Sequence, residues 1–389
     1  MRKFSHLLML LNVLQTWCPA WGQTLSPNQP YRAERSHAVT YDIDFRVAFT
    51  PPYKCKLLKV WLPIPQSDFG QEVHSSELST FPLHIKPIVS TEKVFGNKFA
   101  YFEFEHAEGA QIVRHQLKIT TWQLNWKLDS RNLAKITEWP EAFRPYLKSE
   151  QQAVVVDERV KELGRQFATR PSFQSAELSS VFDWAIKNLK YDHEHASLSA
   201  SALHAFDTRR GHCSDFHGLC ASLGRSVGYP TRVVYGINAF AKNSPSHCKL
   251  EAFLPPYGWV SFDVSETQKL MNGIKANDRL PTKSQKRLRS AARARLLSGF
   301  RDNTWYCQTK GTDYDLAPPA IGRVPVVRTI YAEADGAPLP EPDPANPTRR
   351  EYSWMTAHEY RPSHPVKYPF DDIETLRDYE VDDANQRIH

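Results

Sequence analysis

The stretch that decides the fold is Arg210-Gly211-His212-Cys213-Ser214-Asp215-Phe216-His217-Gly218-Leu219-Cys220. Behind Cys213, apolar residues recur at the spacing of a helix as far as Val227, and Gly228 follows. We therefore expect a helix that begins near Cys213 and ends at Gly228. The N–H groups and the dipole at a helix N-terminus favour a thiolate over a thiol. This position suits a cysteine nucleophile, although a lone buried cysteine is more often a core residue.

A histidine and an aspartate follow on segments that pair locally. Three strand-like segments come after the expected helix: Thr231–Gly236, His247–Leu254 and Trp259–Val264. The turn around Pro256 makes the last two a hairpin, which brings His247 close to Asp263. A cysteine activated by a histidine, with an aspartate orienting the histidine, is the thiol form of triad chemistry. The predicted catalytic residues are Cys213, His247 and Asp263.

These residues resemble the core of the transglutaminase-like superfamily. The resemblance is carried by Gly-x-Cys-x-Asp-x-x-x-Leu from Gly211, by Arg-Ser-Val-Gly-Tyr-Pro-Thr-Arg from Arg225, and by Tyr-Gly-Trp-Val-Ser-Phe-Asp ending at Asp263. It extends from about Val155 to Pro319 and includes an aromatic residue upstream of the cysteine, Tyr191.

The resemblance implies a papain-like α+β core, in which the cysteine helix packs on an antiparallel sheet. It also implies that Cys213 is the nucleophile, His247 the general base and Asp263 its orienting partner. One departure stands beside the histidine, where Cys248-Lys249 replaces the common Ala-Trp. That change puts the substrate preference in doubt, and it places a second thiol next to the triad.

The segments before the core divide into a strand-rich part and a helical part. Alternating apolar residues between Ser36 and about Trp126 indicate an all-β, sandwich-like domain. Helical spacing follows over Gln151–Ala168 and Ala176–Leu189. The predicted organisation is a signal peptide at residues 1–22, a sandwich-like domain at 23–150, a transglutaminase-like core at 151–335 and a Pro-rich, acidic extension at 336–389.

The start of the chain predicts export. Arg2 and Lys3 precede a short apolar run, and a small-x-small site ends at Gly22. No other stretch is long and apolar enough to cross a membrane. Five of the six cysteines would remain after cleavage, so at least one thiol would be free. We expect a periplasmic or secreted protein.

Composition excludes several classes of protein. The 389 residues are 41% hydrophobic and 24% charged, as in globular domains, which argues against disorder and fibrous repeats. The net charge of +6 is too weak to indicate a nucleic-acid partner. A basic stretch over Lys283–Arg295 reads as a solvated helix face, with an anionic envelope surface as the alternative.

The sequence also offers a metal hypothesis. His193-Glu194-His195 would bind zinc with the help of His212, His217, Cys213 or Cys220. The spacing lacks CxxC and HExxH patterns, so a structural role for these histidines is favoured. The chemistry requires no organic cofactor, and no metal is expected.

The function predicted from these residues is an exported cysteine enzyme. It would act on amide bonds of protein or peptide substrates through a thioester acyl-enzyme, as a peptidase, an amidase or an amide transferase. The alternative is a catalytically silent binding module of the cell envelope with the same fold. Neither the acceptor, water or amine, nor the oligomeric state follows from the sequence.

Overall fold

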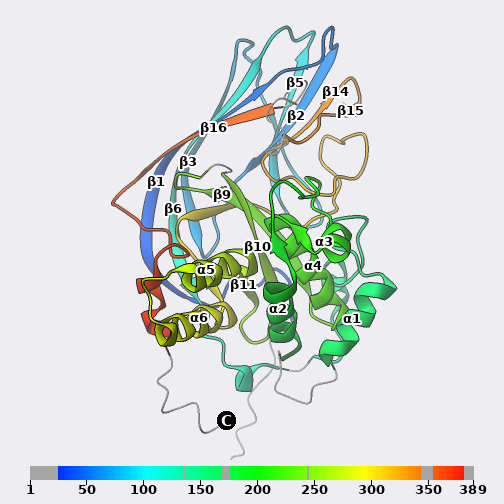
Figure 1. The fold of residues 1–389 in the computed structure, drawn as a ribbon. Helices are drawn as coiled ribbons and strands as arrows, with labels where there is room; N and C mark the ends of the chain where they lie inside the picture. The colour runs from blue at the N-terminus through cyan, green and yellow to red at the C-terminus, as the bar shows by residue number, and fades with distance from the viewer. Residues whose placement is uncertain (1–24, 135, 169–175, 243–244, 343–353, 381–389) are drawn as a thin grey trace, which may run out of the picture.

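The computed structural model describes residues 25–134, 136–168, 176–242, 245–342 and 354–380, and Figure 1 shows its architecture. The predicted signal peptide at residues 1–22 lies outside the described residues. Two strand layers occupy one end of the molecule, and the helices gather around a third sheet at the other end (Figure 1). Among the described helices, none is both long and apolar enough to cross a membrane.

The two strand layers are antiparallel sheets of five strands each. The first contains β1 (Glu34–Phe49), β3 (Gln71–Phe81), β6 (Gln111–Asn125), β12 (Phe300–Arg301) and β16 (Trp354–Pro362). The second contains β2 (Leu57–Ile64), β4 (Ile88–Thr91), β5 (Lys98–Glu105), β14 (Tyr331–Ala334) and β15 (Ala337–Pro338). The alternation in β1 buries one face, where Ile43 and Phe45 share a cluster with Val60 and Phe102 of the second sheet. The antiparallel sheets expected before the core are therefore present.

Strands from the far end of the chain complete both sheets. The whole length of β16 pairs with β1, with Trp354 opposite Phe49 and Pro362 opposite Tyr41. In the second sheet, β14 pairs with β2. The predicted extension after residue 336 thus contributes β15 and β16, and its 3₁₀ helix η3 (Ile373–Tyr379) packs on helix α6 (Thr282–Leu297).

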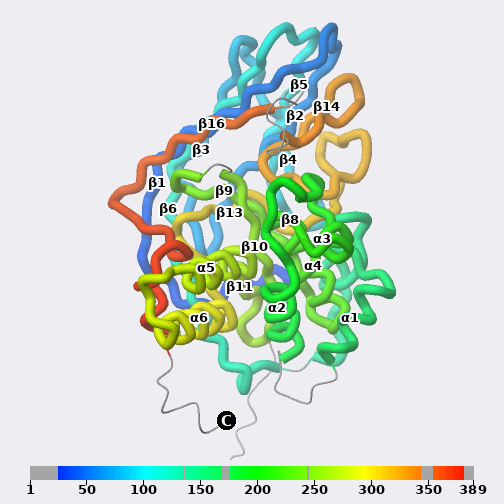
Figure 2. Tube along the Cα trace, viewed as in Figure 1, coloured from blue at the N-terminus to red at the C-terminus, as the bar shows by residue number. Residues whose placement is uncertain are grey.

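The core combines a four-stranded antiparallel sheet with helices, as Figure 2 traces. Its strands are β9 (Thr231–Asn238), β10 (Ser246–Phe253), β11 (Trp259–Phe262) and β13 (Trp305–Lys310). The remaining helices are α1 (Glu158–Ala168), α2 (Ala176–Asn188), α3 (Ala202–Thr208), α4 (Cys213–Ser226) and α5 (Val264–Ala276). Two short strands, β7 (Lys190–Tyr191) and β8 (Arg210–Gly211), pair in parallel, and the 3₁₀ turns η1 (Ser130–Asn132) and η2 (Glu141–Tyr146) precede the core.

The strand predicted over Trp259–Val264 ends at Phe262, and Val264 begins α5. The largest difference from the expected boundaries is at the first helix. The helix predicted over Gln151–Ala168 begins only at Glu158. The reason is a side-chain cap, because the Asp157 carboxylate accepts the backbone N–H of Val160 at 2.9 Å. The residues before it form an irregular segment that packs against α4.

Helix α4 is the centre of the core. Every residue from Cys213 to Arg225 is buried, because α4 contacts β9 and β10 as well as α1, α2 and α3. Such close packing needs a small residue, and a Cβ on Gly218 would collide with the Ala153 carbonyl oxygen.

Replacing Gly218 with alanine is expected to lower the free energy of unfolding by about 2 kcal/mol, because the clash is with backbone that cannot rotate away. Urea unfolding followed by circular dichroism measures the loss. Gly273→Ala in α5 is the matched control, since no atom lies within 4 Å of its Cβ position. There alanine should raise the free energy of unfolding by roughly 0.5–1 kcal/mol. An unchanged Gly218→Ala protein would contradict this packing.

The basic stretch over Lys283–Arg295 is not uniformly solvent-exposed. Arg295 is buried, and its Nη1 donates to the Pro369 carbonyl at 3.1 Å. Arg293 pairs with Asp183 at 2.6 Å. At least these two guanidinium groups serve contacts within the protein, which leaves fewer charges for the anionic surface considered from the sequence.

Candidate active site

The first candidate residue stands where the sequence predicts it. Cys213 begins helix α4, and 8% of its surface is exposed. Just before it, the His212 backbone N–H donates to the Asp215 carboxylate at 3.1 Å. Asp215 also accepts the Ser201 backbone N–H at 3.0 Å and is fully buried. Asp215 therefore anchors the start of α4 as a helix-terminal acid.

The β10–β11 hairpin brings the other two candidates together. His247 lies at the start of β10, and Asp263 follows β11 as the N-cap of α5. The Nε2 atom of His247 lies 2.7 Å from Oδ2 of Asp263, and both residues are buried. Oδ1 of Asp263 accepts the Glu266 backbone N–H at 3.1 Å, which fixes the carboxylate at the helix end.

The surroundings of Cys213 favour its thiolate. The pKa of Cys213 is held well below its usual value by hydrogen bonds from Cys248 and His247, although burial acts in the opposite direction. Burial also opposes a charge on His247, but the Asp263 carboxylate and the Cys213 sulfur outweigh it and raise the pKa of His247 to about 9. Below that pH the site thus favours a thiolate next to an imidazolium.

Cys248 supplies a thiol that the sequence marked only as a departure from the family pattern. Burial and the neighbouring Cys213 sulfur raise the pKa of Cys248. The Sγ atom of Cys248 lies 3.4 Å from Nδ1 of His217. The other ring nitrogen of His217 accepts the Val264 backbone N–H at 3.1 Å, so Nδ1 carries the proton. Burial lowers the pKa of His217 to about 4, so this histidine is neutral at neutral pH.

Tyr191 lies against the start of α4, as its position upstream of the cysteine suggests. The Tyr191 hydroxyl faces the backbone of Cys213, and its pKa is raised chiefly by burial. The Lys269 ammonium sits 3.6 Å from the centre of the Tyr191 ring, and the His193 ring centre lies 5.1 Å away. Aromatic and cationic side chains therefore line this side of Cys213.

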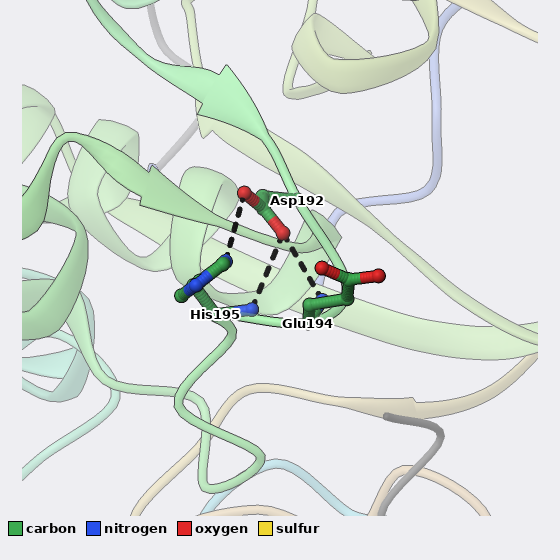
Figure 3. A group of neighbouring side chains, drawn as sticks. All are labelled: Asp192, Glu194 and His195. Atoms are coloured by element: carbon green, nitrogen blue, oxygen red, sulfur yellow. Dashed lines mark hydrogen bonds and ion pairs between the residues drawn. The ribbon is translucent and has the colours of Figure 1, made fainter. Parts of the chain in front are cut away.

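The metal hypothesis finds a different set of ligands. Among the described residues, one group of three could hold an ion, made of Asp192, Glu194 and His195 (Figure 3). The Asp192 carboxylate already accepts the backbone N–H groups of Glu194 and His195 at 3.1 and 3.2 Å, and it lies 3.1 Å from Nδ1 of His195 (Figure 3). This group excludes His193, so the two histidines of the disfavoured zinc hypothesis do not form one ligand set there.

Other residues weighed from the sequence have structural contacts. Arg225 pairs with Glu150 at 2.9 Å, and Arg232 pairs with Glu251 at 2.6 Å, so both guanidinium groups bind carboxylates within the protein. Cys220 is a buried core thiol, and burial raises its pKa to about 12. All five described cysteines are unpaired and buried: Cys55, Cys213, Cys220, Cys248 and Cys307.

Lys249 contacts the candidate Asp263, which was not expected from the sequence. This residue is 1% exposed, and its Nζ lies 2.7 Å from Oδ2 of Asp263 and 2.8 Å from Oδ2 of Asp302. One local signal was available, because residues two apart on a strand share a face and Lys249 follows His247 by two. The second carboxylate is 53 residues away in sequence, and no local pattern indicates it.

The core is similar to that of known proteins. Residues 161–264 match the family model described as the transglutaminase-like superfamily. A solved structure from Cytophaga hutchinsonii, described as a "Putative Cysteine Protease", aligns with a TM-score of 0.58 at 15% identity and covers 87% of this chain and 95% of that chain. An uncharacterized protein of Haemophilus influenzae is 21% identical in an alignment of 315 positions that covers 73% of this chain and 83% of the relative.

The solved periplasmic domain of TgpA from Pseudomonas aeruginosa is also similar, at 17% identity with a TM-score of 0.31. The alignment covers 60% of this chain and 91% of the TgpA domain. A TM-score this low adds nothing to the fold assignment. Residues 161–264, which bear Cys213, His247 and Asp263, thus form a transglutaminase-like core.

Proposed function

We propose that this protein is an exported cysteine enzyme that attacks amide carbonyls of protein or peptide substrates, with Cys213, His247 and Asp263 as its catalytic residues. The observation that carries the proposal is the His247–Asp263 pair, joined at 2.7 Å, next to the Cys213 thiol at the start of α4, whose pKa His247 helps to lower. The predicted signal peptide at residues 1–22 supports export.

The chemistry needs only groups that this chain supplies. The Cys213 thiolate bonds to the carbonyl carbon, and the carbonyl electrons move onto oxygen. His247 then gives its proton to the leaving nitrogen, the C–N bond breaks and a thioester remains. Water or an amine attacks the thioester, His247 takes the proton, and the thiolate of Cys213 is released.

Donors for the developing oxyanion lie next to the sulfur. The backbone N–H of Cys213 belongs to the first turn of α4, where N–H groups lack partners within the helix. The Tyr191 hydroxyl lies against that N–H and can donate a second hydrogen bond. Both donors are available without a metal.

Alkylation tests the proposal without a known substrate. Iodoacetamide, applied from pH 4 to 10 with mass mapping of the product, should label Cys213 rapidly well below the free thiol pKa of about 8.5. Cys220 and Cys248 are internal references, because the pKa of each is raised and neither should react in that range. The His247→Ala protein should lose the fast labelling.

Slow labelling of Cys213 that rises only near pH 8.5, with no dependence on His247, would refute an activated nucleophile. That result would leave the catalytically silent binding module as the function to pursue. Once an activated thiol is established, the thioester can be trapped with hydroxylamine and with added primary amines. This trapping would distinguish hydrolysis of the thioester from amide transfer.

A further inference from the structure

A buried ammonium shares the oxygen through which Asp263 contacts the histidine. Oδ2 of Asp263 lies 2.7 Å from Nε2 of His247 and 2.7 Å from Nζ of Lys249. The side chains of Lys249 and Asp263 are each 1% exposed. Two donors on one carboxylate oxygen restrict the rotation of that carboxylate and partly neutralise its charge.

The Lys249 ammonium is itself held by a second carboxylate. Oδ2 of Asp302, between β12 and β13, lies 2.8 Å from Nζ, and its Oδ1 accepts the Thr304 backbone N–H at 3.1 Å. The rings of Trp305 and Phe370 lie 5.3 and 5.6 Å from Nζ. The ammonium therefore has two anions and two aromatic faces around it, and it cannot move without losing them.

The ionisation of the cluster agrees with this geometry. Burial opposes the charge on Lys249, but the two carboxylates outweigh it and raise its pKa. The pKa of Asp302 is lowered by Lys249 and Thr304 against the effect of burial. Both partners of the pair are thus charged at neutral pH.

Several other charged or titratable groups face this cluster from neighbouring elements. Around His247, Lys249 and Asp263 they are Cys213 and His217 of α4, Cys248 of β10, Glu266 of α5, Arg295 of α6 and Tyr368 before η3. Because His217 is uncharged, Lys249 is the cation that shares the Asp263 carboxylate with the His247 imidazolium.

We propose that Lys249, held by Asp302, is a positioning residue that fixes Asp263 toward His247 and limits how strongly the imidazolium is stabilised. This inference rests on the proposed function. An unopposed buried carboxylate would hold the proton on His247 too tightly for transfer to a leaving amine. A Lys249 ammonium without the Asp302 carboxylate would make His247 lose its proton, and Cys213 would then be an ordinary thiol. With the Lys249–Asp302 pair in place, His247 holds its proton with a strength between these two extremes.

Two single variants should shift, in opposite directions, the pH at which the His247 imidazolium loses its proton. Lys249→Met removes the positive charge from Asp263, so His247 should lose its proton at a pH higher by about half a unit or more. Asp302→Asn leaves the ammonium unopposed, so the same loss should occur at a lower pH by a similar amount. Both are measured by NMR of ¹³C-labelled histidine, with the His247 signal assigned by its absence in His247→Ala.

The matched control is the other buried ion pair on the same strand. Glu251→Gln disrupts the ion pair with Arg232. The stability of this variant should fall, but its His247 should titrate at the same pH as in the native protein. If Lys249→Met does not fold, the double variant Lys249→Met/Asp302→Asn removes both charges together. Its His247 titration should lie between those expected for the two single variants.

Shifts of the same sign in both single variants, or no shift in either, would overturn the positioning role. The readout also separates this inference from the proposed function. If Cys213 of the native protein reacts only near pH 8.5, both the proposed function and the role of Lys249 are refuted. If Cys213 is activated but the His247 titration is the same in the variants as in the native protein, only the role of Lys249 is refuted.

Discussion

Asp263→Asn is expected to slow alkylation of Cys213 at pH 6 by about two orders of magnitude. The substitution removes the charge that keeps His247 protonated, and burial then lowers the pKa of His247 from about 9. Without the imidazolium, Cys213 reverts toward an ordinary thiol, which at pH 6 is ionised in only roughly one molecule in 300. Turnover of an amide substrate should fall by about 10³–10⁴-fold.

The fold should survive this change. Asparagine can still accept the Glu266 backbone N–H at the start of α5, and Lys249 keeps its contact with Asp302. Thermal unfolding of the variant is the control for structural damage. Unchanged alkylation at pH 6 in a folded Asp263→Asn protein would show that another group ionises Cys213.

The second large effect is on stability, where Arg225→Met should lower the free energy of unfolding by about 3–5 kcal/mol. Arg225 reaches Glu150 at 2.9 Å, the Lys148 carbonyl at 2.6 Å and the Thr231 carbonyl at 2.9 Å. Its side chain and that of Glu150 are each 1% exposed. Methionine would leave the Glu150 carboxylate without its cationic partner, and two carbonyls without their donor, in the interior. Urea unfolding measures the loss.

An exposed pair of the same chemistry provides the comparison. Arg293 and Asp183 meet at 2.6 Å, but their side chains are 42% and 46% exposed. Arg293→Met should therefore cost less than about 1 kcal/mol. Equal losses for the two variants would mean that burial does not strengthen the Arg225 contact. The double variant Arg225→Met/Glu150→Gln should recover part of the loss, because it removes the stranded charge.

The predictable parts of this protein are those specified by neighbouring residues. The helix from Cys213 follows from apolar spacing and from the glycine after Val227. The approach of His247 to Asp263 follows from a hairpin whose turn is visible in the sequence. The antiparallel sheets follow from alternation in β1, which buries one face.

The parts that could not be predicted depend on partners far away in the chain. The ion pair of Lys249 needs Asp302, and a buried lysine looks like a surface residue until its anions are known. The pairing of β16 with β1 joins residues more than 300 positions apart, and no local signal specifies that register. The domain boundary placed at residue 150 stays a prediction, since strands from both sides of it build the same sheets.

The return of β16 to β1 bears on how the chain is made. A ribosome releases Glu34–Phe49 long before Trp354–Pro362, so one edge of the first sheet stays open through most of synthesis. A long open edge is a template for unwanted strand pairing, and contacts of such large sequence separation form slowly. Until its last strand emerges, the chain therefore leaves the β1 edge exposed to pairing with other strands.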